Sequence, residues 1–266
     1  MTRIAVVGHV EWVDFISVAH LPRPGEVLHG TGAFARAAGG GGVAAVVLAE
    51  LGAEVDFYCA LGRDERGRAT DEQLAVRGVQ THVAWREEPT RRAMTLLDDA
   101  GERAIVTLGE RLEPSGSDEL DWERLRSADA AYFTAGDAGA LRWAREARVL
   151  VATPRARTAL EGDGATLDAL VYSAGDPHET EWAGRAAHRA RLLVATEGAR
   201  GGRWSGETEG TWSAVPPPGP PRDSYGCGDS FAAAFTLALG AGASVAHAAA
   251  RGADCGARCL TRAGAP

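Results

Sequence analysis

The chain has 266 residues and a formal net charge of −8. That length suits one large α/β domain or two small ones, and an acidic chain lacks the basic face that nucleic-acid binding requires. Its apolar stretches are short or broken by charge, so no membrane span is expected. The N-terminus lacks the pattern of a signal peptide, which makes the cytoplasm the expected location.

All 28 residues counted as lysine or arginine are arginine, and asparagine is also absent. A P-loop and a protein-kinase site each need a lysine, as does Schiff-base chemistry, so all three are excluded. The four cysteines show no CxxC spacing, and buried small residues are a better reading of them than a metal site.

Short apolar runs alternate with helix-forming segments along the chain. From the N-terminus we expect a strand, a helix, a strand, a second helix and a hairpin, at residues 3–8, 43–52, 54–62, 66–78 and 91–109. Four further apolar runs, several with helical spacers between them, follow at residues 130–136, 148–154, 169–175 and 191–198. Strands that alternate with helices predict a mostly parallel sheet covered on both faces.

Two segments break this rhythm, residues 12–37 and 83–109. Both read as strands with polar faces and tight turns, so we expect a small β lid standing off the main sheet. Exposed strand edges can pair with a second chain, and the lid is therefore a candidate contact surface of a homodimer. The proline run at 215–221 predicts an extended approach to the segment that follows it.

That following segment, DSYGCGDSF at residues 223–231, precedes an apolar, alanine-rich helix. Gly226 and Gly228 let backbone N–H groups point at an oxyanion, and the helix dipole favours negative charge there. A carboxylate beside bound phosphate would be repelled, so Asp229 suits a general base that takes a proton from an attacking hydroxyl. The alternative is a plain turn into a buried helix, with Asp229 as an ordinary first-turn residue.

DSYGCGDSFAAAF resembles the C-terminal motif of the ribokinase (PfkB-type) carbohydrate kinase family, usually D-T-x-G-A-G-D-x-F. Further likenesses follow in order along nearly the whole chain: RPGEVLHG, AGGGGVAAVVLAELG, LGRDERG, TEGARGG and CLTRAGA. The resemblance implies a ribokinase-like three-layer α/β sandwich with a β lid, as one kinase domain over residues 1–266. It also implies ATP-dependent phosphorylation of a hydroxyl on a sugar or nucleoside.

Carried across by position, the resemblance assigns Asp229 as the base. The turn that stabilises the transferring phosphoryl group would be Gly226, Cys227 and Gly228. The substrate contacts would be Asp14, Gly39, Gly40, Gly41 and Asp137. The nucleotide contacts would be Thr196, Gly198 and Gly201. Glu181 would act on Mg²⁺, and Asp223 would lie near a monovalent-cation site such as one for K⁺.

The sequence departs from the family pattern at three positions. Val43 replaces an asparagine that contacts substrate hydroxyls in the family. His178 replaces an asparagine that organises magnesium and phosphate there. Cys227 replaces an alanine, and a thiol at a helix N-terminus is expected to be more reactive than the other cysteines. With no lysine present, an arginine must supply any mobile positive charge, and Arg91 or Arg92 is the candidate.

Alternatives stay open for several of these residues. Asp14 suits a surface strand end, Asp137 a helix cap, the glycine run at 39–42 a loop, and TEGARGG a hairpin turn. At the level of the whole protein, the rivals are a nucleoside kinase of the same fold and a ligand sensor without turnover. Asp229 argues against the sensor, because a sensor needs no base.

Overall fold

A computed structural model describes residues 1–163 and 165–264. Its main sheet has nine strands in the order β13-β12-β11-β10-β9-β8-β1-β4-β5. The strands from β11 to β5 run parallel, whereas β12 and β13 are antiparallel. Their bounds are β1 Arg3–Val7, β4 Glu54–Gly62, β5 Val79–Arg86, β8 Ala130–Phe133, β9 Leu150–Ala152, β10 Leu167–Ser173, β11 Ala190–Thr196, β12 Gly202–Gly206 and β13 Gly210–Trp212.

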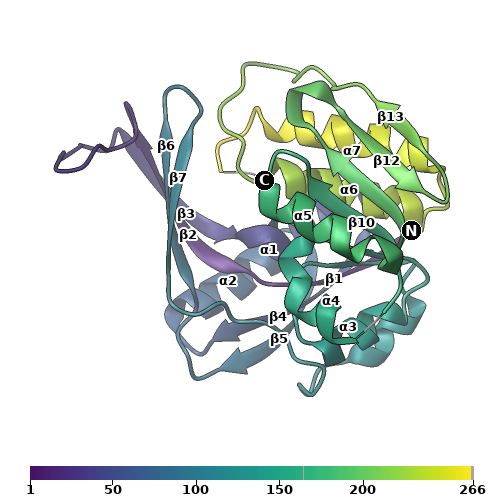
Figure 1. Cartoon of the computed structure of the whole chain (residues 1–266). Helices are drawn as coiled ribbons and strands as arrows, with labels where there is room; N and C mark the ends of the chain where they lie inside the picture. The colour runs from purple at the N-terminus through teal and green to yellow at the C-terminus, as the bar shows by residue number, and fades with distance from the viewer. Residues whose placement is uncertain (164, 265–266) are drawn as a thin grey trace.

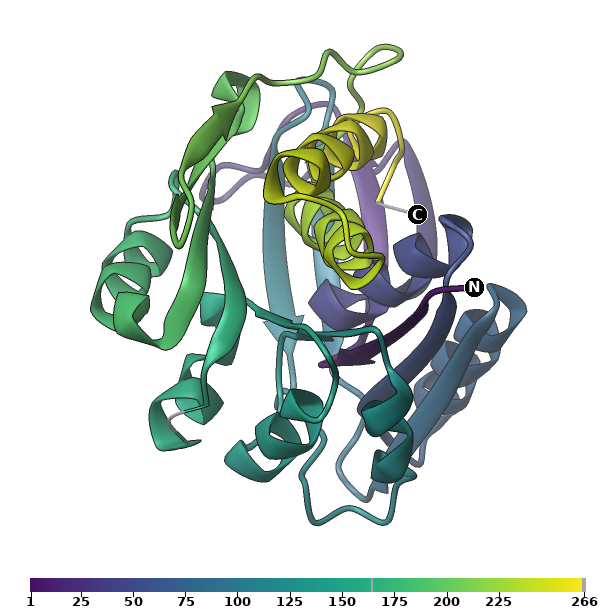
Figure 2. The same cartoon turned by 90° about the vertical axis from the view of Figure 1, so that its right-hand side faces the viewer.

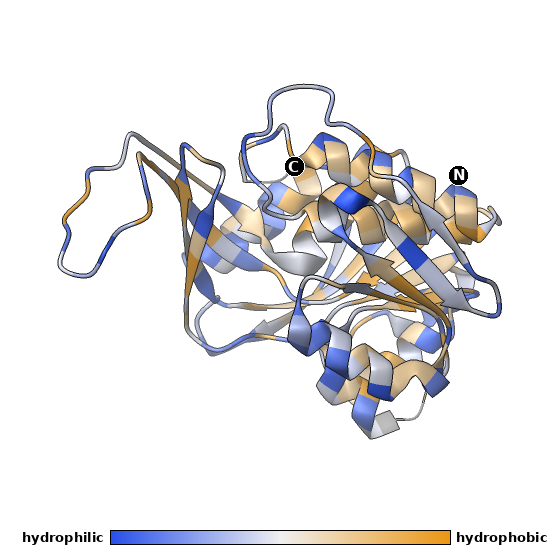
Figure 3. Cartoon of the chain, turned by 45° about the horizontal axis from the view of Figure 1, so that its top comes forward, coloured by the Kyte–Doolittle hydropathy of each residue, from blue (hydrophilic) through white to orange (hydrophobic). Residues whose placement is uncertain are grey.

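Helices cover both faces of this sheet, as Figure 2 shows. One layer holds α1 Gly39–Glu50, α2 Glu65–Val76, α6 Cys227–Gly240 and α7 Val245–Cys259, and the other holds α3 Ala138–Arg145, α4 Arg157–Asp163 and α5 Pro177–Ala186. Side chains alternate along β1, so Ile4 and Val6 pack into one core cluster and Ala5 and Val7 into the other. The apolar strands therefore lie between two helical layers (Figure 3), and the predicted three-layer sandwich is confirmed.

A second sheet of four strands stands beside the main one (Figure 1). It has the order β3-β2-β6-β7, with bounds β2 Glu11–Val18, β3 Gly32–Ala38, β6 Arg92–Asp98 and β7 Arg103–Leu108. The predicted hairpin at 91–109 is the antiparallel pair β6–β7. The predicted lid boundary needs one correction, because residues 83–86 belong to β5, which pairs with β4 in the main sheet.

The glycine run forms helix rather than loop. Helix α1 begins at Gly39, four residues before the predicted start, and Gly39 to Gly42 are buried in its first turn. A Cβ on Gly41 would lie 2.7 Å from the His9 carbonyl oxygen, so glycine allows the helix to pack against the end of β1. Within the described residues, no helix combines the length and apolarity needed to span a membrane.

Candidate active site

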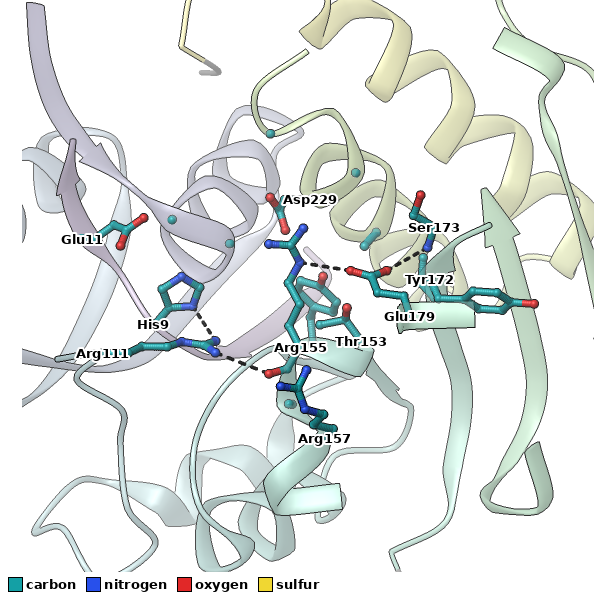
Figure 4. Close-up of a pocket in the computed structure, with 18 of the residues that line it drawn as sticks. His9, Glu11, Arg111, Thr153, Arg155, Arg157, Tyr172, Ser173, Glu179 and Asp229 are labelled. Carbon is teal, nitrogen blue, oxygen red and sulfur yellow. Dashed lines mark hydrogen bonds and ion pairs between the residues drawn. The ribbon is translucent and has the colours of Figure 1, made fainter. Parts of the chain in front are cut away.

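A cavity of about 520 Å³ lies between the lid and the carboxyl ends of the parallel strands. This is where open α/β sheets bind their ligands. Residues from β2, β7 and the segment before β6 line one side of it, and residues from β10, α5 and β11 line the other. The first turn of α6 lies between the two sides, and Figure 4 shows Asp229 there.

Asp229 occupies the first turn of α6, as the sequence predicts. Gly226 caps this helix in the left-handed conformation, with φ of 74°, which glycine adopts without strain. A Cβ on Gly40 would lie 3.0 Å from Asp229 Oδ1, so the first turns of α1 and α6 meet at this carboxylate. Burial raises the pKa of Asp229, and Arg155 opposes that shift more than any other cation. A carboxylate with a raised pKa in a cleft suits proton abstraction.

The glycine turn reaches the cavity through its backbone. Gly226 and Gly228 line the cavity, whereas Cys227 does not. A hydrogen bond with Cys259 and burial raise the pKa of the Cys227 thiol far above its usual value. The prediction of a reactive Cys227 is therefore wrong, because its side chain lies against α7 and its thiol stays protonated. The backbone N–H of Cys227 donates to the Ser224 carbonyl oxygen within the same turn, at 3.4 Å.

The segment is anchored from behind by Asp223 and Tyr225. Asp223 accepts hydrogen bonds from the amides of Tyr225 (2.7 Å) and Gly264 (2.8 Å), one on each carboxylate oxygen. The Tyr225 hydroxyl accepts one from the amide of Gly39, at 3.2 Å. Asp223 thus holds the turn in place, and both its oxygens already have partners.

On the lid side, Glu11 takes the place expected for Asp14. Side chains alternate along β2, and Glu11 lines the cavity while Asp14 lies on the opposite face of the lid. There Asp14 pairs with Arg92 at 3.0 Å. The substrate role expected for Asp14 does not fit this geometry, and Glu11 is the carboxylate positioned for it.

Of the other predicted substrate contacts, some line the cavity and others do not. Gly39 and Gly40 line the cavity, whereas Gly41 packs behind it. Val43 is buried in the core, with 1% of its surface exposed. Asp137 lies outside the cavity and caps α3, because it accepts a hydrogen bond from the amide of Ala140 at 2.7 Å. The helix-cap alternative for Asp137 is the one this placement supports.

On the side away from the lid, Thr196 lines the cavity at the end of β11, near Tyr172 and Ser173. Gly198 and Gly201 form the turn between β11 and β12, with φ of 58° and 91°, and do not line the cavity. They set the path of the chain after Thr196, as the hairpin-turn reading expects.

Glu181 and His178 lie in a smaller adjoining pocket, which shares Arg155, Arg157 and Glu179 with the main cavity. Glu179 is the carboxylate that reaches the main cavity, and its side chain accepts a hydrogen bond from the Ser173 amide at 2.9 Å. Among the described residues, no group of three or more His, Cys, Asp or Glu side chains could hold a metal ion.

Several cavity arginines were not singled out from the sequence. Arg155, which follows β9, forms an ion pair with Glu179 at 3.4 Å and lies beside Asp229 (Figure 4). Asp229 is the main cause of the raised pKa of Arg155. Arg111 donates to His9 Nδ1 at 2.9 Å. Burial and Arg111 hold the pKa of His9 well below its usual value, so His9 is neutral.

A buried carboxylate beside a glycine turn at a helix N-terminus, under a lid, is the arrangement of a small-molecule phosphotransferase. The chain belongs to the pfkB family of carbohydrate kinases, whose family model matches residues 1–152 and 165–266. The family and fold predicted from the sequence are therefore confirmed.

Individual relatives agree with this assignment. An ATP-dependent ribose-1-phosphate kinase of Halopiger xanaduensis is 32% identical over 139 residues, which are 50% of this chain and 46% of that protein. The chain thus matches about half the length of this curated relative. The solved structure of ribokinase from Giardia lamblia has a TM-score of 0.83 at 17% identity, covering 99% of this chain and 94% of the other. Arabidopsis thaliana ribokinase, complexed with ribose and ATP, has a TM-score of 0.77 at 21% identity, covering 100% and 95%.

Proposed function

We propose that the protein transfers the γ-phosphoryl group of ATP to a hydroxyl of a sugar or sugar-like acceptor. The observation that carries this proposal is the position of Asp229, in the first turn of α6 inside the lid-covered cavity. A base at that point can reach an acceptor on the lid side, while the turn at 226–228 offers backbone amides to the phosphoryl group.

In this mechanism Asp229 removes the proton of the acceptor hydroxyl. The hydroxyl oxygen forms a bond to the γ-phosphorus as the bond to the β,γ-bridging oxygen breaks, and ADP leaves. The acceptor lies against Glu11, Gly39 and Gly40, and the nucleotide lies on the Thr196 side. Exclusion of water by the lid limits hydrolysis of ATP.

Mg²⁺ is part of the proposal, because this ion binds through one or two carboxylates together with substrate phosphates rather than in an all-protein cage. Glu179, which lines both pockets, is the carboxylate that would hold it, and it would neutralise charge on the phosphates. Glu181 lines the smaller pocket alone and, two residues along the helix, does not face the same way. A monovalent cation near Asp223 is a further prediction. Assays in KCl and NaCl at equal ionic strength test it.

The proposed function is tested by ADP formation from Mg-ATP with a panel of free sugars, sugar phosphates and nucleosides. Ribose 1-phosphate belongs in the panel because the Halopiger relative is named for it. We expect acceptor-dependent ADP release with at least one sugar-type acceptor. Turnover with nucleosides alone would instead assign a nucleoside kinase. Ligand binding without turnover across the panel would favour a non-catalytic sensor.

We also propose that the lid mediates a homodimer. Its outer face is more apolar than the sequence suggests, since Met94, Val106 and Leu108 are 37%, 58% and 47% exposed. β3 and β7 are also the edge strands of the lid sheet, and an edge strand can pair with a second chain. Sedimentation should therefore show a dimer that Val106→Glu converts to monomer. A monomer at all working concentrations of the unaltered protein would contradict this.

A further inference from the structure

Three arginines enter the cavity on its lid side: Arg91 before β6, Arg103 on β7 and Arg111 after β7. Arg91 forms an ion pair with Glu11 at 3.2 Å, and Arg111 forms one with Glu113 at 3.1 Å. In neither pair does the buried Nε atom make a well-aligned hydrogen bond. Arg111 also donates to His9 Nδ1 and to the carbonyl oxygens of Thr134 (3.1 Å) and Arg155 (3.4 Å). The terminal nitrogens of Arg91 have no such partner among the described residues, so Arg91 keeps donor capacity for a ligand, whereas Arg111 contributes mainly its charge.

Arg103 differs from these two because it has no carboxylate partner among the described residues. Its guanidinium reaches from the lid to the hydroxyl of Ser224, just before the glycine turn. The lid side of the cavity thus carries three guanidinium groups against the carboxylates of Glu11 and Glu113. His9, neutral in this setting, adds no charge. The lid side keeps an excess of positive charge.

A free sugar is a poor match for this surface. Neutral hydroxyls are best held by carboxylate and amide groups, but Asp14 faces away and Val43 is buried where an amide was expected. Glu11 is the one carboxylate of the lid strands that lines the cavity. Arginine is instead the side chain whose planar fork fits phosphate, with two parallel hydrogen bonds from one guanidinium.

Resting on the proposed function, we infer that the acceptor is a phosphorylated sugar, whose existing phosphate binds Arg91 and Arg103, with Arg111 adding positive charge beside them. The phosphate would lie under β7, with its sugar extending toward Asp229. On binding, the Arg103 guanidinium would move from Ser224 to the phosphate or donate to both. Because Arg91 and Arg103 come from the lid, the same contacts would favour lid closure over the acceptor.

The chain offers a matched pair of variants to test this inference. Arg91 and Arg92 are neighbours, but Arg91 lines the cavity while Arg92 pairs with Asp14 on the outer face. Arg91→Gln should raise the KM for a phosphorylated acceptor at least tenfold, and Arg92→Gln should leave it within about twofold. Arg103→Gln is a second cavity variant that breaks no ion pair with a carboxylate, so it should fold normally and show the same loss.

The decisive comparison is kcat/KM for sugars with and without phosphate, such as ribose against ribose 1-phosphate and ribose 5-phosphate. We expect the phosphorylated form to be preferred by about 10²-fold or more, since charge-assisted hydrogen bonds are the strong ones. Arg103→Gln should shrink that preference, and KM for ATP should not change. Equal use of free and phosphorylated sugars would overturn the inference and leave the kinase proposal standing. A preference for sugar acids would overturn it too and show that the arginines bind a carboxylate of the acceptor rather than a phosphate.

Calorimetry without ATP separates this inference from the proposed function. Ribose 1-phosphate and ribose 5-phosphate are the probes. Binding of either probe that is lost in Arg103→Gln and kept in Arg92→Gln would support the phosphate subsite even if no turnover were found. Binding unchanged in both Arg91→Gln and Arg103→Gln would contradict it.

Discussion

Replacing Asp229 by asparagine should lower turnover by about 10²- to 10⁴-fold, the range expected when a general base is lost. Asparagine has nearly the same shape but cannot accept the hydroxyl proton. Binding of Mg-ATP should persist, because the backbone amides at 226–228 are unchanged. Steady-state ADP release and nucleotide binding by calorimetry measure the two effects separately. Turnover near that of the unaltered protein would remove Asp229 from the mechanism.

Stability gives an independent readout for the same variant. Burial raises the pKa of Asp229 above its unfolded value, so the group favours folding only while protonated, and this contribution is lost as pH rises through the folded pKa. Above the folded pKa the ionised carboxylate therefore opposes folding. Asp229→Asn should melt at the same temperature as the unaltered protein or higher, as is common for functional residues. A large drop in melting temperature would indicate a structural role.

Asp14→Asn is the control for this experiment. Asp14 lies on the outer face of the lid, paired with Arg92 at 3.0 Å. We expect its replacement to leave KM for the acceptor within about twofold. A selective rise in that KM would restore the substrate role that the sequence pattern gave to Asp14.

The sequence predicts a helix or strand of this fold well where the local pattern of apolar and turn residues determines it. The strand at 54–62 has the predicted ends, because its apolar run is bounded by turns on both sides. The segment DSYGCGDSF also places Asp229 correctly, since a residue in the first turn of a helix has a nearly fixed direction relative to its axis.

The errors in the candidate site come from orientation. On a strand, a shift of one position moves a side chain to the other face, and this separates Glu11 from Asp14. For Asp137, the sequence does not distinguish a helix cap from a ligand contact. In the structure its carboxylate accepts a hydrogen bond from the Ala140 amide and caps α3. The cavity arginines come from separate segments, such as 91, 103, 111 and 155, so only the folded chain brings them together.

Arg155 is the most consequential of these arginines. It forms an ion pair with Glu179 at 3.4 Å, and its guanidinium lies beside Asp229 (Figure 4). From this position a fixed cation can stabilise the transferring phosphoryl group. Arginines that act in this way contribute about 10³- to 10⁵-fold to turnover in other phosphoryl-transfer enzymes. Arg155→Gln should lower kcat by at least 10²-fold, and Arg155→Lys should recover part of it, because lysine restores the charge but not the planar fork.

The pH profile distinguishes this role from a purely structural one. Arg155 is the cation that most lowers the pKa of Asp229, so its removal should raise that pKa further. Since a general base works only when deprotonated, the acid limb of kcat/KM against pH should move to higher pH in Arg155→Gln. In Arg155→Lys the limb should stay near its original position. If kcat falls in Arg155→Gln while the acid limb does not move, Arg155 does not act on Asp229, and its effect must come from Glu179 and the nucleotide side of the cavity.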